Sequence, residues 1–405
     1  MVNYGWEQIL DYLNLKHQKD HPPKELADIC DQETYQKTLA YHRSKTSFGF
    51  ASSTVSFVVM IALLLSGYFG LLDQWLRQFF DSEIFLALAF FGTLFLAMDL
   101  LSLPLQWYQT FVLEEKFGFN KTTPKIFWAD KFKGYLIAMV LGAPVIWLLL
   151  FLIDKLGSGF WWYFLIAIAG FSFLLNVFYT SLILPIFNKL TPLPEGELKQ
   201  AIQNYSNTVS FPLSNIFVID GSKRSSKSNA FFSGLGKKKK IVLYDTLIES
   251  HDTPELVSIL AHEVGHYKKK HIIQGFVLSI LQSALMLFLL SLMVQSESLS
   301  MALGGQQVAM HLNLLAFGLL YTPVSKLIGV CMNVFSRKNE YQADAYAAST
   351  SNPAALVSAL KKLSIDNLSN LWPHGWFVFF YYSHPPLVER LRALESHLTK
   401  SQYPE

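Results

Sequence analysis

The stretch GYLIAMVLGAPVIWLLLFLIDKLGSGFWWYFLIAIAGFSFLLNVFYTSLIL covers residues 134–184 and contains two long apolar runs, 134–153 and 160–184. Each run is long enough to cross a hydrocarbon layer of ~30 Å, which takes ~20 residues of α-helix. Only the short segment from Asp154 to Gly159 separates them. The stretch therefore predicts a tight helical hairpin inside a membrane.

Four further apolar runs, 50–71, 84–105, 272–294 and 308–334, bring the number of predicted transmembrane helices to six. The composition agrees, because 51% of the 405 residues are apolar and 16% are charged, against ~25% charged in an ordinary globular protein. The mean hydropathy is +0.28. These values argue against a disordered chain and a cytosolic multidomain enzyme, and they predict an all-α polytopic membrane protein.

Positively charged residues alternate between the two sides of the predicted membrane helices. Of the 33 Lys and Arg, 30 lie before the first helix, in the 106–133 loop, in the 185–271 segment or after residue 334, and 2 lie in the alternate connections. The positive-inside rule then places both termini and the 185–271 segment in the cytoplasm. A net charge of +3 gives no reason to expect a nucleic-acid partner, and the Lys237–Lys240 run is interpreted as a solvated loop near anionic membrane lipid.

This topology divides the chain into an N-terminal cytoplasmic segment, four membrane helices, a long cytoplasmic segment, two membrane helices and a C-terminal cytoplasmic segment: 1–49, 50–184, 185–271, 272–334 and 335–405. Within 185–271, the patterns predict an amphipathic helix at 195–208 and β-strands at 216–220 and 240–245. A Gly- and Ser-rich connection between the two strands suggests a long hairpin. We therefore expect a small α+β unit attached to the membrane helices.

The motif LAHEVGH (260–266) carries the clearest chemical signal. His262 and His266 are four residues apart, so a helix presents both imidazoles on one face. A catalytic zinc ion takes three protein ligands and leaves one position open. Glu263 stands beside the first histidine, where its carboxylate can act as a general base toward a water molecule activated by the metal. The motif predicts a site for one zinc ion per chain.

A third zinc ligand is predicted in the segment SRKNEYQADAYAAS (336–349), which follows the sixth membrane helix. Its helical pattern places Glu340 and Asp344 on one face. Glu340 can bind zinc, and Asp344 can accept the free ring N–H of a ligand histidine. The preceding membrane helix can return the chain to the two histidines.

The tail segment FYYSHPPLVERLRAL (380–394) offers two further groups for catalysis. His384 precedes two prolines that fix a turn, and Arg390 follows on the next predicted helix. Either side chain could stabilise an oxyanion formed at a peptide carbonyl. His271 lies about 140° around the helix from His266 if one helix continues through both, so we do not expect it to bind zinc.

Several long motifs in one order make the chain resemble the M48 family of integral-membrane zinc metalloproteases, in particular the Ste24-type CAAX prenyl proteases. The resemblance extends from about residue 34 to 397 and rests on SFGF (47–50), TFVLEEKFGFN (110–120), FNKLTPLPEGELK (187–199), DGSKRSSKSNAFFSG (220–234), LAHEVGHYKKKH (260–271), SRKNEYQADAYA (336–347) and YYSHPPLVERL (381–391). It implies a gluzincin-like zinc protease portion.

The resemblance implies zinc binding by His262, His266 and Glu340, with Glu263 as the base and with His384 and Arg390 near the transition state. It also implies that Asn229 and Ala230 belong to an edge strand that holds an extended peptide substrate through backbone hydrogen bonds. A barrel of membrane helices around a water-filled chamber is a further implication. The expected partners are a peptide or protein substrate, prenylated or not, and membrane lipid.

Two departures from the family pattern bear on substrate and source. Eukaryotic members have seven membrane helices, whereas the residues before Pro22 are too short and polar to supply the first one. Lys227 and Phe231 stand where the family usually has His and Tyr. Together with a short 249–255 stretch, these features favour a bacterial member in the inner membrane, with the endoplasmic reticulum as the location in a eukaryote.

Three alternatives stay open at this point. One is a general membrane quality-control protease without a prenyl requirement. A site-2-type intramembrane protease also uses His-Glu-x-x-His, but its Asn-Pro-Asp-Gly-like segment is missing. The third is a metal-regulated transporter or scaffold, which Asp99 and Lys326 suggest because charged side chains inside membrane helices are costly in lipid.

Overall fold

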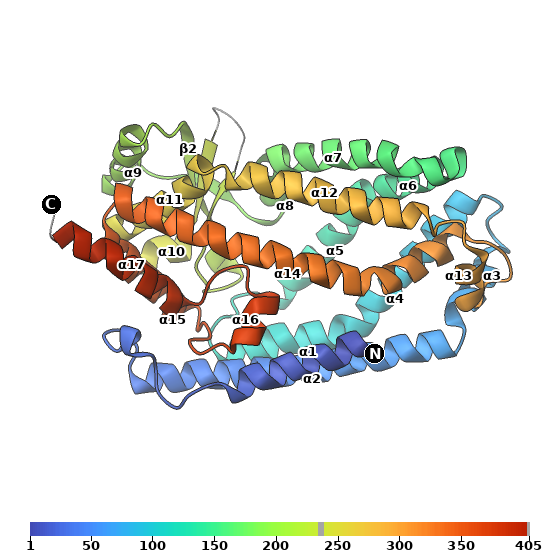
Figure 1. Cartoon of the computed structure of the whole chain (residues 1–405), viewed down its shortest axis with the longest axis horizontal. Coiled ribbons are helices and arrows are strands. Elements are labelled where there is room, and N and C mark those ends of the chain that lie inside the picture. Colours follow the sequence, from blue (N-terminus) through green and yellow to red (C-terminus); the bar gives the residue numbers. More distant parts are fainter. Residues whose placement is uncertain (234–238, 403–405) are drawn as a thin grey trace.

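The computed structural model describes residues 1–233 and 239–402 and is mostly helical. Its longest helices run side by side along the long axis of the molecule (Figure 1). The sheet and helices α9, α11 and α17 lie at one end, and α3 and α13 lie at the other. The helices are α1 (Val2–Lys16), α2 (Gln32–Leu65), α3 (Tyr68–Leu76), α4 (Glu83–Tyr108), α5 (Pro124–Ile137), α6 (Ala143–Leu156), α7 (Phe160–Phe178), α8 (Leu184–Phe187), α9 (Glu197–Thr208), α10 (Asp245–Ser250), α11 (Thr253–Lys268), α12 (His271–Ser291), α13 (Glu297–Ala302), α14 (Met310–Thr350), α15 (Pro353–Asp366), α16 (Gly375–Tyr381) and α17 (Leu387–Gln402).

Five continuous helical stretches among the described residues are long and apolar enough to cross a membrane. One of them, Pro124–Phe187, contains the third predicted span, which runs from the end of α5 into α6, and the fourth, which includes α7. The chain reverses between these helices at Gly157–Gly159 (Figure 1), and Gly157 has a positive φ of 53°, a conformation that glycine adopts without strain. The predicted hairpin therefore forms as two antiparallel helices. The six apolar runs are mostly helical, but the run 50–71 is divided between α2 and α3 by a turn at Ser66 and Gly67.

The membrane helices are loosely packed against one another. Between 0% and 17% of the residues in the most apolar part of each stretch are buried, whereas helices in a tight bundle bury a continuous stripe. This exposure is expected of helices that face lipid on one side and interior space on the other. The water-filled chamber remains a prediction.

The two charged residues within the membrane helices have structural partners. Asp99 of α4 accepts hydrogen bonds from Lys131 and Tyr135 of α5. Lys326 of α14 pairs with Glu7 of α1 at 2.8 Å. These pairs account for the two charges and leave the transporter hypothesis without the feature that motivated it.

A four-stranded sheet in the order β1-β2-β4-β3 forms the α+β part, with β1 (Leu190–Pro192), β2 (Leu213–Ile219), β3 (Ala230–Ser233) and β4 (Lys239–Tyr244). The predicted strands correspond to β2 and β4. The prediction of a hairpin between them is wrong, because β2 and β4 are parallel, and parallel neighbours need a crossover connection. The connection contains β3, which pairs antiparallel with β4 at the edge of the sheet. Lys237 and Lys238 of the lysine run lie outside the described residues.

The core at this end of the molecule joins the sheet to α9, α11, α14 and α15. Ile202, Leu243, Leu260 and Leu356 are each at most 2% exposed in this cluster, and burial of each such side chain contributes ~1.5–3 kcal/mol. Helix α11 begins with a capping box. The Asp252 side chain accepts a hydrogen bond from the Glu255 N–H, and the Glu255 side chain accepts one from the Asp252 N–H. Packing and capping together fix the helix that carries the His-Glu-x-x-His motif.

Candidate active site

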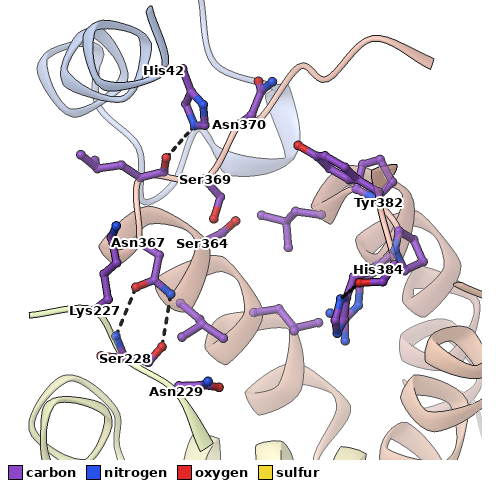
Figure 2. Close-up of a pocket in the computed structure, with 18 of the residues that line it drawn as sticks. His42, Lys227, Ser228, Asn229, Ser364, Asn367, Ser369, Asn370, Tyr382 and His384 are labelled. Carbon is purple, nitrogen blue, oxygen red and sulfur yellow. Dashed lines mark hydrogen bonds between the residues drawn. The ribbon is translucent and has the colours of Figure 1, made fainter. Parts of the chain in front are cut away.

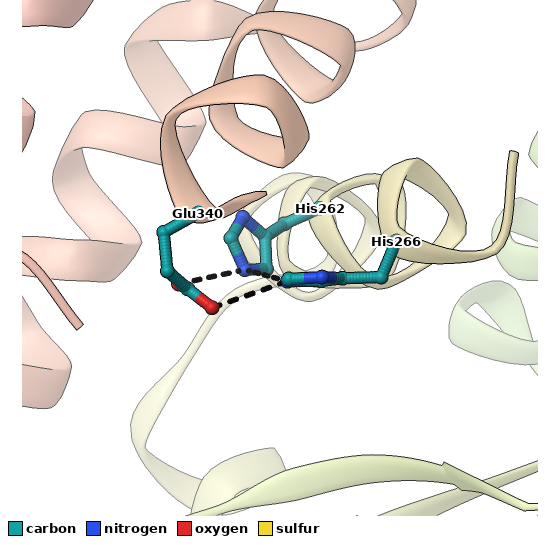
Figure 3. Close-up of side chains that lie close together, drawn as sticks. All are labelled: His262, His266 and Glu340. Carbon is teal, nitrogen blue, oxygen red and sulfur yellow. Dashed lines mark hydrogen bonds and ion pairs between the residues drawn. The ribbon is translucent and has the colours of Figure 1, made fainter. Parts of the chain in front are cut away.

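Helices α11 and α14 bring His262, His266 and Glu340 together (Figure 3). The Nε2 atoms of the two histidines are 3.2 Å apart. They lie 3.5 Å and 3.3 Å from the two carboxylate oxygens of Glu340. Ligand atoms ~2.0–2.1 Å from a tetrahedral zinc ion are about 3.3 Å from one another. The three side chains therefore have the spacing and the N, N, O donor set of a catalytic zinc site.

A glycine allows the two helices to approach closely enough to form this cluster. A Cβ atom on Gly265 would lie 3.0 Å from the backbone of Ala343, tighter than ordinary van der Waals contact. Because Gly265 precedes His266 and Ala343 follows Glu340 by less than one helical turn, this contact sets the distance between the ligands on the two helices. Oε2 of Glu340 is buried and accepts no hydrogen bond from the described residues, as expected of an oxygen that binds a metal ion.

Asp344 fixes the ring of the first histidine. Nδ1 of His262 donates to Oδ1 of Asp344 at 2.8 Å, which directs Nε2 toward Glu340 and the candidate metal position. Burial lowers the pKa of His262, but the carboxylates of Asp344 and Glu340 outweigh burial and raise it to about 9, so a metal would displace a proton from Nε2 when it binds. Asp344 also receives two hydrogen bonds from Arg390, at 2.8 and 2.6 Å.

His271 and Gln342 fix the ring of the second histidine, His266. Nε2 of His271 lies 3.0 Å from the side-chain oxygen of Gln342, so it donates there and leaves its Nδ1 as an acceptor. Nδ1 of His266, at 3.0 Å, then donates to His271. The Nε2 atom of His266 is left unprotonated toward the metal position.

Glu263 and His384 lie beside the three candidate ligands. Both line a cavity of about 450 Å³ together with the three candidate ligands, and burial raises the pKa of the Glu263 carboxyl. His384 lies on the turn between α16 and α17 with Nε2 3.4 Å from Glu340. Burial lowers the pKa of His384, and a neutral imidazole ring can donate one hydrogen bond.

Comparison with known proteins decides the family. Residues 192–398 match the peptidase family M48, and residues 11–189 match the family described as CAAX prenyl protease N-terminal, five membrane helices. The chain belongs to the M48 family. It is 35% identical to CAAX prenyl protease 1 of Saccharomyces cerevisiae, over 98% of this chain and 93% of that protein. It is 36% identical to the Oryza sativa homologue, over 94% and 91%.

A solved relative supports the same assignment. The crystal structure of S. mikatae Ste24p superposes with a TM-score of 0.93 at 35% identity, covering 97% of this chain and 96% of that one. The M48 chain described here is thus a membrane zinc metalloprotease, as its sequence predicts. These matches do not favour a transporter, a scaffold or a general protease without a prenyl requirement.

The remaining predicted residues of this M48 protease lie around the same centre. Asn229 directly precedes the edge strand β3 and Ala230 begins it. Asn229 lines a second cavity, of about 900 Å³, whose wall also includes His384 and Arg390 (Figure 2). His384 lies where the two cavities meet, because it lines both. All nine predicted site residues therefore gather at one end of the molecule.

Four residues with contacts at the site were not predicted to act there: His271, Gln342, Lys227 and Asn367. His271 was set aside on the assumption that one helix runs through it. The chain instead breaks at Lys270, which has a positive φ of 60°, and α12 begins at His271. Gln342 lies between Glu340 and Asp344, and Lys227 is noted above only as a departure from the family pattern, so neither was given a role at the site. Asn367 lies outside the quoted motifs, and no local pattern connects it to the site.

Proposed function

We propose that this protease removes the C-terminal tripeptide of prenylated CAAX polypeptides at the cytoplasmic face of a membrane. The observation that carries the proposal is the lining of the 450 Å³ cavity. Beside Glu263 and the candidate ligands, it contains Ile272 and Gly275 of α12 and Met332 and Phe335 of α14. These apolar positions belong to helices long enough to span a membrane, so a lipid-modified residue next to the cleaved bond would meet an apolar surface. The relatives' names point to the same substrate.

In the proposed mechanism, His262, His266 and Glu340 hold one zinc ion per chain. Zinc, when bound, polarises the substrate carbonyl and lowers the pKa of a water molecule. Glu263 accepts the proton of the attacking water and delivers it to the leaving amine. His384 donates a hydrogen bond to the oxyanion of the tetrahedral intermediate.

Arg390 acts through other residues in this proposal. Its two hydrogen bonds to Asp344 hold the carboxylate that orients His262, and its Nη1 atom is 3.8 Å from Glu340. Arg390 is therefore a positioning residue, and its positive charge offsets the two carboxylates. The strand β3, with Asn229 and Ala230, holds the substrate extended.

The distribution of Lys and Arg supports a multi-pass topology with both termini in the cytoplasm and with the protease segment 185–271 and the C-terminal segment 335–405 on that side. The segment 1–49 would share this side, and 50–184 and 272–334 would carry the membrane helices. The inner membrane of a bacterium stays the favoured location and the endoplasmic reticulum the alternative.

Mass spectrometry of products from a farnesylated CAAX peptide and its unprenylated twin tests the function. The wild-type protein should release the tripeptide from the farnesylated peptide alone. Glu263→Gln should abolish release and leave zinc content unchanged, because Gln cannot take a proton, and the exposed Glu249→Gln should behave as wild type. Equal cleavage of the two peptides would contradict a prenyl requirement, and full activity of Glu263→Gln would overturn the mechanism.

A further inference from the structure

The open edge of β3 presents alternate backbone groups to a substrate. The Tyr244 N–H donates to the Asn229 carbonyl at 3.1 Å, so Asn229 faces β4. In an antiparallel ladder, neighbouring residues point their N–H and C=O groups in opposite directions. Ser228 and Ala230, on either side of Asn229, therefore point theirs outward. The Ala230 N–H donates to the side-chain oxygen of Asn229 at 2.8 Å, so it is the Ala230 carbonyl that faces a substrate strand.

A side chain already occupies one end of this edge. Asn367, which follows α15, accepts a hydrogen bond from the Ser228 N–H at 3.2 Å and donates one to the Ser228 carbonyl at 3.3 Å (Figure 2). Its amide thus binds Ser228 in place of another strand. A peptide that pairs with β3 can extend along Ala230–Ser233 but cannot pair with Ser228. At that point it must leave the sheet.

The space beyond Ser228 is the 900 Å³ cavity, and one cation in its wall is available for a ligand. The Lys227 ammonium is paired with Glu114 at 2.8 Å, and Arg390 is paired with Asp344. Lys45 of α2 also lines the cavity and is an exposed residue. Its ammonium lies 5.8 Å from the centre of the Tyr41 ring and forms no ion pair within the described part of the chain.

The other end of β3 lies among apolar side chains. Phe231 and Phe232 lie in the 450 Å³ cavity with the apolar residues of α12 and α14. The binding edge is therefore apolar toward the membrane helices and cationic beyond Ser228. The C-terminus of a CAAX polypeptide has the same asymmetry, with a lipid at the residue before the cleaved bond and a carboxylate three residues after it.

We propose that the substrate lies antiparallel to β3, with its lipid beside α12 and α14 and its terminal carboxylate bound by Lys45. Asn367 ends the strand pairing and directs the last residues into the 900 Å³ cavity. This inference rests on the proposed function and adds to it: Lys45 makes the enzyme select a free C-terminus. A charge-assisted hydrogen bond to a carboxylate is roughly twice as strong as a neutral one.

The test compares two farnesylated CAAX peptides, one with a free C-terminal carboxylate and one with a carboxamide. Wild type should prefer the carboxylate peptide by ~10-fold or more in kcat/KM, since ~1.4 kcal/mol corresponds to a factor of ten. Lys45→Met should bring the ratio close to one, mainly by raising KM for the carboxylate peptide. Lys37→Met is the matched control on the same helix, because Lys37 is exposed and lines neither cavity, and it should keep the wild-type ratio.

Three outcomes would overturn the inference. A wild-type ratio near one, or an unchanged ratio in Lys45→Met, removes the role of Lys45 and leaves the proposed function intact. Failure of wild type to cleave either peptide removes the proposed function as well.

The direction of the peptide is tested separately by photocrosslinking in the Glu263→Gln protein. A photoreactive group on the last residue of a farnesylated CAAX peptide should attach to segments 41–45 or 364–370. Attachment to 332–335 would show the opposite direction and overturn the inference.

Discussion

His271→Phe should weaken zinc binding although His271 is not a ligand. The substitution removes the nitrogen that accepts the Nδ1–H of His266, at 3.0 Å, and also the donor to Gln342. It keeps an aromatic ring in a position that is 6% exposed. Without its acceptor, the His266 ring is free to rotate and to place its proton on either nitrogen, so part of the population no longer presents an unprotonated Nε2 to the metal.

The size of the effect follows from the kind of contact. Loss of a group that orients a ligand histidine costs ~10–100-fold in metal affinity, which corresponds to about 1.4–2.7 kcal/mol. The assay is competition for zinc between the metal-free protein and a fluorescent chelator of known affinity. Activity at saturating zinc should recover in large part, because all three candidate ligands remain.

The matched control is His251→Phe. His251 is also 6% exposed and also forms hydrogen bonds, to Ser250 and to the Ala359 carbonyl, but it has no contact with the zinc ligands. This variant reports any general effect of losing a buried histidine and should leave the zinc affinity unchanged. A zinc affinity of His271→Phe within twofold of wild type, or an equal loss in both variants, would refute the relay from Gln342 to His266.

Three further predictions concern other parts of the molecule. Asp344→Asn should lower the free energy of unfolding by about 3 kcal/mol, because the buried Arg390 loses its hydrogen-bonded carboxylate and keeps only the longer 3.8 Å contact with Glu340. A fall in the thermal unfolding midpoint in detergent checks it, and an unchanged midpoint would contradict it. Gly70→Ala should cost about 1–3 kcal/mol by the same measurement, since its Cβ would lie 2.0 Å from the Gly304 carbonyl oxygen, whereas Gly92→Ala, with nothing within 4 Å, should be harmless. Removal of metal by a chelator should abolish peptide cleavage and one equivalent of zinc should restore it; activity that survives in metal-free protein would exclude the zinc mechanism.

The membrane helices could be predicted from sequence because the bilayer imposes one simple condition. A segment that crosses lipid must satisfy every backbone group internally, so a long apolar run specifies a helix without regard to its neighbours. The run 134–153 accordingly continues as helix from the end of α5 into α6, and the run 160–184 forms α7 and the helical turns that follow it. The sheet follows no such local condition. The patterns at 216–220 and 240–245 indicate strands equally well in a parallel or an antiparallel pair, and the hairpin interpretation was therefore wrong.

The residues of the site likewise differ in whether a sequence pattern predicts them. His262 and His266 share a helix, as do Glu340 and Asp344, and a spacing of four residues places each pair on one face. Such pairs are visible in a sequence. Asn367 instead meets Ser228 across 139 residues, and an asparagine after a helix has no pattern that identifies its partner.

His271 shows how a correct local rule can fail on one backbone angle. The helical projection excludes His271 from the ligand set, and the structure agrees that it is not among the three clustered side chains. The projection also places it away from His266, and there it fails, because Lys270 adopts a left-handed conformation that begins a new helix. Nothing in a lysine predicts that conformation, which glycine or asparagine commonly adopts. The packing of α11 and α12 offsets the conformational free energy of holding Lys270 in this region. As a result, His271 at the start of α12 contacts the candidate ligand His266. The backbone break and the His271–His266 contact are thus one feature, and a variant that lets a single helix run through Lys270 should lose zinc affinity as His271→Phe does.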